Sequence, residues 1–400
     1  LPLACVFACA PDGEPLRMVV LDLAHGGVAY DLKVVELHTL EDVRELRGEA
    51  VRPIGSAVIR IDARRIASAT TEDEMREALL AEPGRAVEAQ FIESDGVLYP
   101  SDFHSLSLAT AYHAFEKARE YALARGMSRD TLREAPFYYF PKMTDDPARG
   151  YAADNAAWIV PLRSFLVLPF ERLQAIPLAV NRGVIAHEYA HGIFNAEVLG
   201  GDWWPRYLDR WGEFSAGAIM LRSIDEGFAD AWALGSAGDL GFIERSLGAA
   251  EASARDTAFD AGKHCHSQDG FDAELERTRR WPVRQREEYW ASRPYRIGTM
   301  WAAALERAGA RAGAGGYDRV MDALFASYRT AGEASLATLV ERDVDGARVG
   351  SFAAIGAAIV AGANDAAARE ALCATLMDRF SLLPSDLGAC DGVSPGRECR

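Results

Sequence analysis

The residues best suited to chemistry lie in one short stretch, His187-Glu188-Tyr189-Ala190-His191, which has the pattern H-E-x-x-H. In a helix, side chains four residues apart share a face, so His187 and His191 can direct their imidazoles at one point. Two neutral imidazoles in this arrangement provide half of a zinc site. The carboxylate of Glu188 lies beside that point, where it can take a proton from a water that the metal has made acidic. The pattern therefore predicts a catalytic zinc centre with Glu188 as its base.

The residues around this pattern favour a metal site over an ordinary helix that happens to contain two histidines. The stretch from Asn181 to Asn195 reads as a helix, and Val184, Ile185, Ile193 and Phe194 are apolar. Such a helix is expected to be buried, and buried polar side chains need partners. A zinc ion would provide that partner.

A catalytic zinc usually has three protein ligands and one open position. A third histidine six residues after His191 would be one solution, but residue 197 is Glu. The stretch Asp225-Glu226-Gly227-Phe228-Ala229-Asp230 offers another, with Glu226 as the third ligand on a later helix. Asp230 is four residues further on, hence on the same helical face, and could accept the remaining N–H of a ligating histidine.

Together, H-E-Y-A-H and D-E-G-F-A-D resemble the gluzincin metallopeptidases, the thermolysin and fungalysin group, whose pattern is H-E-x-x-H followed by (N/G)-E-x-x-x-D. The chain departs from that pattern at Asp225, where Asn or Gly is more usual. The resemblance implies an α+β fold of the thermolysin-like zincin type, with a mixed sheet, an active-site helix and a mainly α-helical C-terminal part. It also implies that His187, His191 and Glu226 bind the zinc ion, that Glu188 is the base, and that Asp230 orients a ligating histidine.

Two further segments resemble parts of the same group. Asp154-Asn155-Ala156-Ala157-Trp158 is similar to the N-A-x-W edge strand that holds substrate backbone, which implies substrate contacts at Asn155 and Ala156. An edge strand can accept a peptide as an added strand, although an ordinary sheet strand is the alternative. Arg293 to Trp301 is similar to a fungalysin segment, H-x-I-G-x-x-W-A, with Tyr295 at the position of the His. We expect the Tyr295 hydroxyl to donate to an oxyanion, with Arg296 as a further substrate-binding donor.

Composition and the chain start bear on the compartment. The 400-residue chain has a formal net charge of −16, which argues against nucleic acid and against an anionic membrane surface as partners. The opening residues LPLACVFACA look like the end of an apolar leader. Either Cys9 carries a lipid, or the stretch is the remnant of an ordinary signal peptide. We therefore expect an exported protein that is extracellular, periplasmic or lipid-anchored at the cell surface.

The other four cysteines are Cys265, Cys373, Cys390 and Cys399, which in an exported protein predict two disulfides with three pairings open. Cys390 and Cys399 bracket a Gly/Pro-containing tail, so a bridge between them would fix the C-terminus and leave Cys265 with Cys373. His264 and His266 have no evident partner pair, so we expect no second zinc site there. A calcium site at Asp145, Asp146 and Asp154 has no support from their loose spacing.

The expected organisation has four segments: a leader remnant at 1–9, an N-terminal α/β part at 10–104, a catalytic sheet with zinc helices at 105–240, and a mainly helical part at 241–400. The N-terminal part is an accessory domain, a pro-like segment or the upper sheet of the catalytic part. Within it we expect helices at Thr39–Arg47 and Thr71–Ala81. Residues 135–142 and 156–170 read as strands, and residues 265–293 as a charged surface excursion. The expected C-terminal helices are Met300–Ala312, Tyr317–Thr330, Glu333–Glu341, Phe352–Ala361 and Asp365–Phe380.

These features predict a zinc-dependent metalloendopeptidase that acts on peptides or proteins. The alternatives are a zinc aminopeptidase or other zinc hydrolase, and a non-catalytic surface lipoprotein with a relic zinc site. A relic would be free to lose Glu188, yet the base and all expected ligands are present.

Overall fold

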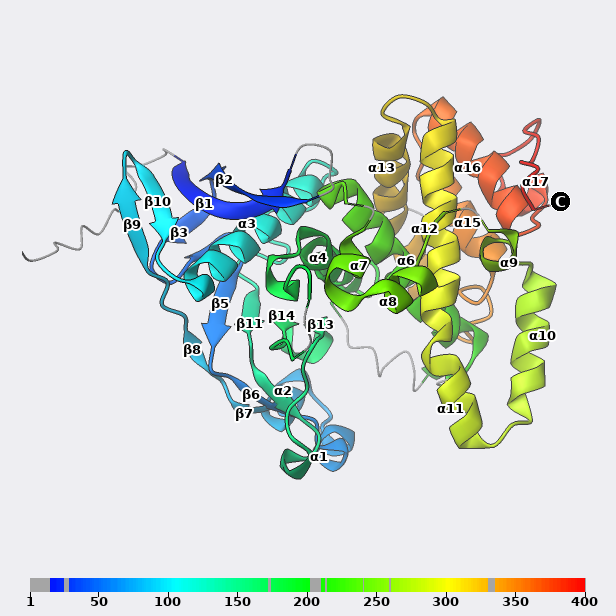
Figure 1. Ribbon diagram of the computed structural model, residues 1–400. Coiled ribbons are helices and arrows are strands. Elements are labelled where there is room, and N and C mark those ends of the chain that lie inside the picture. Colours follow the sequence, from blue (N-terminus) through cyan, green and yellow to red (C-terminus); the bar gives the residue numbers. More distant parts are fainter. Residues whose placement is uncertain are drawn as a thin grey trace, which may run out of the picture. The chain divides into compact units, whose positions relative to one another are not determined.

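The computed structural model describes residues 15–24, 29–171, 174–201, 210–212, 214–239, 241–258, 260–329 and 335–399. Helices combine with mixed sheets, so the α+β class predicted from the sequence is confirmed (Figure 1). Cys9 and most of the tryptophan-rich loop before Trp211 lie outside the described residues. Among the described residues, no helix combines the length and the apolar character that a membrane crossing requires.

The chain forms two compact units, one of Leu1–Gly192 with Ser236–Gly248 and one of Ile193–Gly235 with Ala249–Arg400. The first unit contains the sheets. They have the strand orders β2-β1-β10-β9, β13-β14-β11-β5-β8, β12-β6-β7 and β3-β4. The strands are β1 (Leu16–Leu23), β2 (Tyr30–Leu37), β3 (Leu40–Asp42), β4 (Arg47–Gly48), β5 (Arg52–Gly55), β6 (Val58–Arg60), β7 (Leu80–Glu82), β8 (Arg85–Ala86), β9 (Phe91–Ser94), β10 (Val97–Pro100), β11 (Pro136–Tyr139), β12 (Lys142–Thr144), β13 (Ala156–Ile159) and β14 (Ser164–Val167).

Two long helices define the core of the first unit. Helix α3 (Phe103–Leu123) packs on β1 and β10, and Figure 1 shows it running beside that sheet. Helix α4 (Arg182–Glu197) carries the H-E-x-x-H pattern. The shorter helices here are α1 (Ala63–Ser68), α2 (Glu72–Leu79) and α7 (Phe242–Leu247). The cap of α2 was predictable, because Thr71 and Glu74 form a capping box at its start.

The second unit is helical, and its longest helices are α6 (Ala216–Ala237) and α12 (Arg293–Arg311). Trp301 of α12 is fully buried against Phe352 and Phe380, whose rings stack on each other with centroids 4.6 Å apart. The other helices are α8 (Ala249–Ala254), α9 (Ala261–His264), α10 (Gln268–Arg279), α11 (Val283–Ala291), α13 (Gly316–Arg329), α14 (Leu336–Arg342), α15 (Phe352–Ala361), α16 (Ala366–Arg379) and α17 (Pro384–Leu387). The predicted C-terminal helices are therefore present, although the predicted end at Thr330 and the predicted start at Glu333 lie outside the described residues.

Two local predictions were wrong. Residues 39–47 form β3, a turn and β4 rather than a helix. The buried carboxylate of Glu116 accepts hydrogen bonds from the backbone of His38 and Thr39 and from the Thr39 hydroxyl, and these bonds hold the chain extended. Residues 156–170 contain β13 and β14 joined by a tight 3₁₀ turn rather than one strand. Residues 265–293, expected as a charged surface excursion, form the largely exposed helices α10 and α11, each with a buried aromatic residue.

The structure selects one of the three pairings that the sequence left open, and it is not the one in which Cys390 bonds to Cys399. The bridges join Cys265 to Cys399 and Cys373 to Cys390, with Cα–Cα distances of 5.7 Å and 5.5 Å. Cys373 lies on α16 and Cys390 lies shortly after α17, which packs back against α16. The tail beyond Cys390 runs to Cys399, which is bonded to Cys265 at the end of α9. This contact depends on tertiary packing, so the spacing of the cysteines could not reveal it.

Candidate metal centre

The start of α4 is fixed by Asn181, a fully buried residue. Its side-chain oxygen accepts hydrogen bonds from the backbone N–H groups of Gly183 (3.1 Å) and Val184 (3.3 Å). Its amide nitrogen donates to the Phe242 carbonyl and the Ser246 hydroxyl, both at 2.7 Å. Asn181 therefore serves as the N-cap of α4 and joins it to α7.

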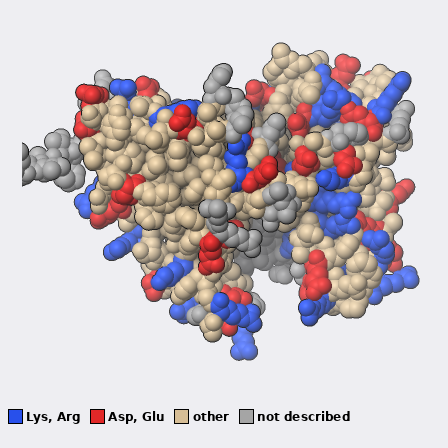
Figure 2. Space-filling view, in the orientation of Figure 1, with Lys and Arg blue, Asp and Glu red and all other residues tan. Residues whose placement is uncertain are grey.

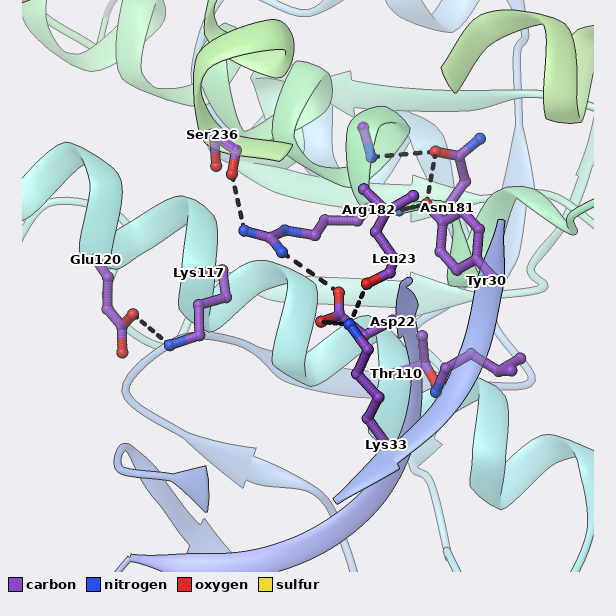
Figure 3. A network of polar contacts seen from close by, with 12 residues as sticks. Asp22, Leu23, Tyr30, Lys33, Thr110, Lys117, Glu120, Asn181, Arg182 and Ser236 are labelled. Carbon is purple, nitrogen blue, oxygen red and sulfur yellow. Dashed lines mark hydrogen bonds and ion pairs between the residues drawn. The ribbon is translucent and has the colours of Figure 1, made fainter. Parts of the chain in front are cut away.

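Arg182, the first residue of α4, adds a charged anchor (Figure 3). Its guanidinium donates to the Asp22 carboxylate of β1 (3.3 Å) and to the Ser236 carbonyl (2.8 Å). Its backbone N–H donates to the Tyr30 hydroxyl of β2 at 2.9 Å. Although burial raises the pKa of Asp22, Arg182 and other charges lower it overall, so the carboxylate is ionised at neutral pH. The first turn of α4 is thus tied to the β1–β2 ribbon.

Close packing fixes the middle of α4. The ring of Tyr189 stacks on Phe165 of β14 with centroids 5.7 Å apart. At Gly192, an added Cβ would lie 2.9 Å from Leu132 and 3.5 Å from Phe165. An alanine there would displace the terminal methyl groups of Leu132, so the glycine lets the helix pack closely against this side chain.

The two histidines converge as the spacing predicts. Their Nε2 atoms lie 3.0 Å apart, and His187 is only 5% exposed. One ligand atom from each of His187, His191 and Glu226 can be chosen so that all three lie within 4.8 Å of one another. In the part of the chain that the structure describes, this is the one group of three or more His, Cys, Asp or Glu side chains with such geometry.

This donor set fits zinc. Two nitrogens that each bind zinc at about 2.0–2.1 Å in tetrahedral geometry lie about 3.3 Å apart, close to the separation of the imidazole nitrogens. Two imidazoles and one carboxylate form the donor set of a catalytic zinc with an open fourth position. The fit supports the ligand set inferred from the sequence.

Glu188 lies next to the edge strand β13. Its carboxylate accepts a hydrogen bond from the backbone N–H of Trp158 at 2.8 Å, and the side chain is buried. β13 is the last strand of its sheet and pairs only with β14 among the described strands. The Asn155 carbonyl accepts a hydrogen bond from the Leu168 N–H, on the side of β14. Successive residues of a strand direct their backbone hydrogen-bonding groups to opposite sides, so those of Ala156 and Trp158 point away from β14, toward the open edge. The predicted substrate strand thus has Ala156 on its open edge, whereas the Asn155 carbonyl is used within the hairpin.

In the second unit, Glu226 and Asp230 lie one turn apart on α6, as the sequence predicted. The guanidinium of Arg255 donates to both oxygens of Asp230 and lies 3.5 Å from the Glu226 carboxylate. Burial alone would lower the pKa of Arg255, but the two carboxylates raise it above its usual value, so the cation is permanent. Sequence reasoning missed Arg255, because no local pattern marks it.

Tyr295 lies beside this cluster. Its ring is 5.3 Å from the Arg255 guanidinium carbon, and the residue is 41% exposed. The placement depends on Gly227 of α6 and Gly298 of α12, whose backbones touch: a Cβ on Gly227 would lie 2.3 Å from the Gly298 carbonyl oxygen. Only two glycines permit this approach, which brings the second turn of α12 next to Glu226.

Other side chains singled out in the sequence have different surroundings. Arg296 is exposed, donates to the Gly262 carbonyl at 3.3 Å and lines a cavity between α10 and α12. His264 is fully buried, with its two ring nitrogens bonded to the backbone of Asp256 and Asp260. Asp154 accepts bonds from the Glu171 backbone and the Gln174 amide.

Comparison of the sequence with models of known protein families finds no matching family, and comparison with curated proteins finds no match. The assignment of function therefore depends on the residues themselves.

Proposed function

We propose that this protein is a zinc-dependent metallopeptidase of the gluzincin type that cleaves peptide bonds within extended chains. One observation carries the proposal: the carboxylate of Glu188 is bonded to the backbone of the edge strand β13, on the helix that presents His187 and His191. A base, a metal-ligating pair and a strand that can receive peptide backbone would then serve one reaction.

In this proposal His187, His191 and Glu226 hold the zinc ion, which when bound makes a water acidic and polarises a carbonyl. The open edge of β13 at Ala156 pairs with the substrate backbone as an added strand. Glu188 accepts a proton from the attacking water and returns it to the leaving amine. The Trp158 N–H keeps the Glu188 carboxylate in place for both transfers.

Two side chains of the second unit supply positive charge or hydrogen-bond donors. The Tyr295 hydroxyl donates to the oxyanion that develops on the scissile carbonyl. Arg255, which is permanently charged, holds Asp230 and Glu226 in place as a positioning residue. Asp230 is in turn assigned the role of orienting a ligating histidine.

The test compares the native protein with Glu188→Gln and, as a control, with Glu276→Gln, whose side chain is 59% exposed. We expect each to bind one zinc ion, and Glu188→Gln alone to lose about 100- to 10,000-fold in cleavage of casein, because it cannot transfer the proton. Product mapping by mass spectrometry distinguishes internal cleavage from removal of terminal residues. Absence of zinc from the native protein, or full activity in Glu188→Gln, would overturn the proposal.

A further inference from the structure

A cavity of about 360 Å³ lies within the second unit, between α10 and the first turns of α12. Three arginines line it, Arg277 from α10 and Arg293 and Arg296 from α12, together with Glu274. Figure 2 shows Lys and Arg side chains gathered over this part of the surface. Such a concentration of positive charge is notable in a chain whose formal net charge is −16.

The charges inside this cavity do not balance. Glu274 forms an ion pair with Arg293 and lies 4.0 Å from Arg277. Arg296 has no carboxylate partner among the described residues, and its hydrogen bond goes to the Gly262 carbonyl. The cavity lining thus holds three guanidinium groups and one carboxylate, a formal excess of two positive charges that a ligand could balance.

An unpaired donor in the cavity lining also points to a ligand. The Nε atom of Arg293 is buried and has no hydrogen-bond acceptor in the described part of the chain. His266 also lines the cavity; burial lowers its pKa, so it is neutral at pH 7 and needs no counter-charge. The remaining wall includes the buried apolar residues Ile297 and Met300.

We propose that this cavity binds the carboxylate group of a peptide, with an adjoining apolar group against Ile297 and Met300. Guanidinium groups match carboxylates in shape and charge and bind them through paired hydrogen bonds. The inference rests on the proposed peptidase function for the identity of the ligand as a peptide. Tyr295, the assigned oxyanion donor, lies between Arg293 and Arg296 on the first turn of α12, so both sites depend on the same turn.

The carboxylate could be a peptide C-terminus or an acidic side chain, and binding experiments can separate them. We would titrate the full-length Glu188→Gln protein with N-acetyl-leucine, N-acetyl-glutamic acid α-amide, N-acetyl-leucinamide and inorganic phosphate, using calorimetry. We expect at least one carboxylate to bind and the neutral leucinamide not to bind. The tighter of the two carboxylates identifies the source.

The variants Arg296→Gln and Arg277→Gln should each weaken carboxylate binding about tenfold, the effect expected for a lost charge-assisted hydrogen bond. Arg280→Gln is the matched control, because its side chain is 85% exposed and does not line the cavity. Circular dichroism checks that each variant folds, and either arginine variant alone suffices for the test. Equal binding of leucinamide, tightest binding of phosphate, or no loss in a folded arginine variant would overturn the proposal.

This outcome is separable from that of the peptidase proposal, because the titration requires neither zinc nor turnover. Carboxylate binding by a protein that cleaves nothing would refute only the peptidase function. Cleavage by a protein that binds none of the carboxylates would refute only the cavity assignment.

Discussion

Arg255 connects the chemistry of the second unit to its stability. Its guanidinium contacts two carboxylates of α6 and an aromatic ring of α12, and its side chain is only 13% exposed. A buried carboxylate that loses its cationic partner is left in surroundings that solvate charge poorly. The same ion pair therefore supports both the fold and the position of Glu226.

We expect Arg255→Met to lower the free energy of unfolding by about 3 kcal/mol, because Asp230 loses its two-bond partner in a buried position. Arg284→Met, at a side chain that is 90% exposed, should change it by less than about 0.5 kcal/mol. Urea denaturation measures both, and zinc titration should show weaker binding in Arg255→Met alone. Equal stabilities for the two variants would contradict this role.

For individual residues, the sequence predicted which side chains meet where helical periodicity alone brings them together. His187 and His191 are four residues apart on one helix, and so are Glu226 and Asp230, so helical periodicity alone brings each pair together. Arg255 reaches Asp230 through tertiary packing, for which spacing along the chain gives no signal. The same reason explains why the cavity arginines were not grouped in advance.

At the scale of elements, α4 depends on polar contacts at its first turn. Unpaired N–H groups at a helix start need acceptors, and Asn181 supplies one for two of them. Since His187 is only five residues after the start of α4, the direction of the helix at its start determines where the imidazoles lie. The cap is therefore part of the candidate metal centre.

Asn181→Ala should lower the free energy of unfolding by about 2 kcal/mol, because a cap and two buried donor bonds are lost. It should also weaken zinc binding. Ser351→Ala removes the cap of α15 and should cost about 1 kcal/mol while leaving zinc affinity unchanged. Thermal unfolding and zinc titration of the two variants provide the comparison; unchanged zinc affinity in Asn181→Ala would separate the cap from the metal centre.

Elements with strong local signals were predicted well. The range expected for α15, Phe352–Ala361, is the one observed, because a capping serine and a continuous apolar run define it. The helix expected at residues 39–47 does not form. A buried carboxylate on α3, far away in sequence, holds His38 and Thr39 extended at its start. Tertiary hydrogen bonds overrode local preference there.

At the scale of the whole molecule, the two disulfides constrain the second unit very differently. The Cys265–Cys399 bridge joins residues 134 positions apart, whereas Cys373 and Cys390 are 17 apart. A cross-link restricts the unfolded chain more when it closes a longer loop. The longer bridge also holds the segment before α10 beside the C-terminal tail, next to His266 of the arginine-lined cavity.

Replacing Cys265 and Cys399 by Ala should therefore lower the free energy of unfolding by about 5 kcal/mol, against about 3 kcal/mol for Cys373 and Cys390, by the loop-entropy relation. Calorimetric unfolding of the two double variants measures the difference. Proteolysis without reductant, followed by mass spectrometry, independently tests the pairing through peptides that contain Cys265 linked to Cys399. A larger loss on removal of the short loop would show that local packing at Cys373 and Cys390, both fully buried, outweighs the restriction of the unfolded chain.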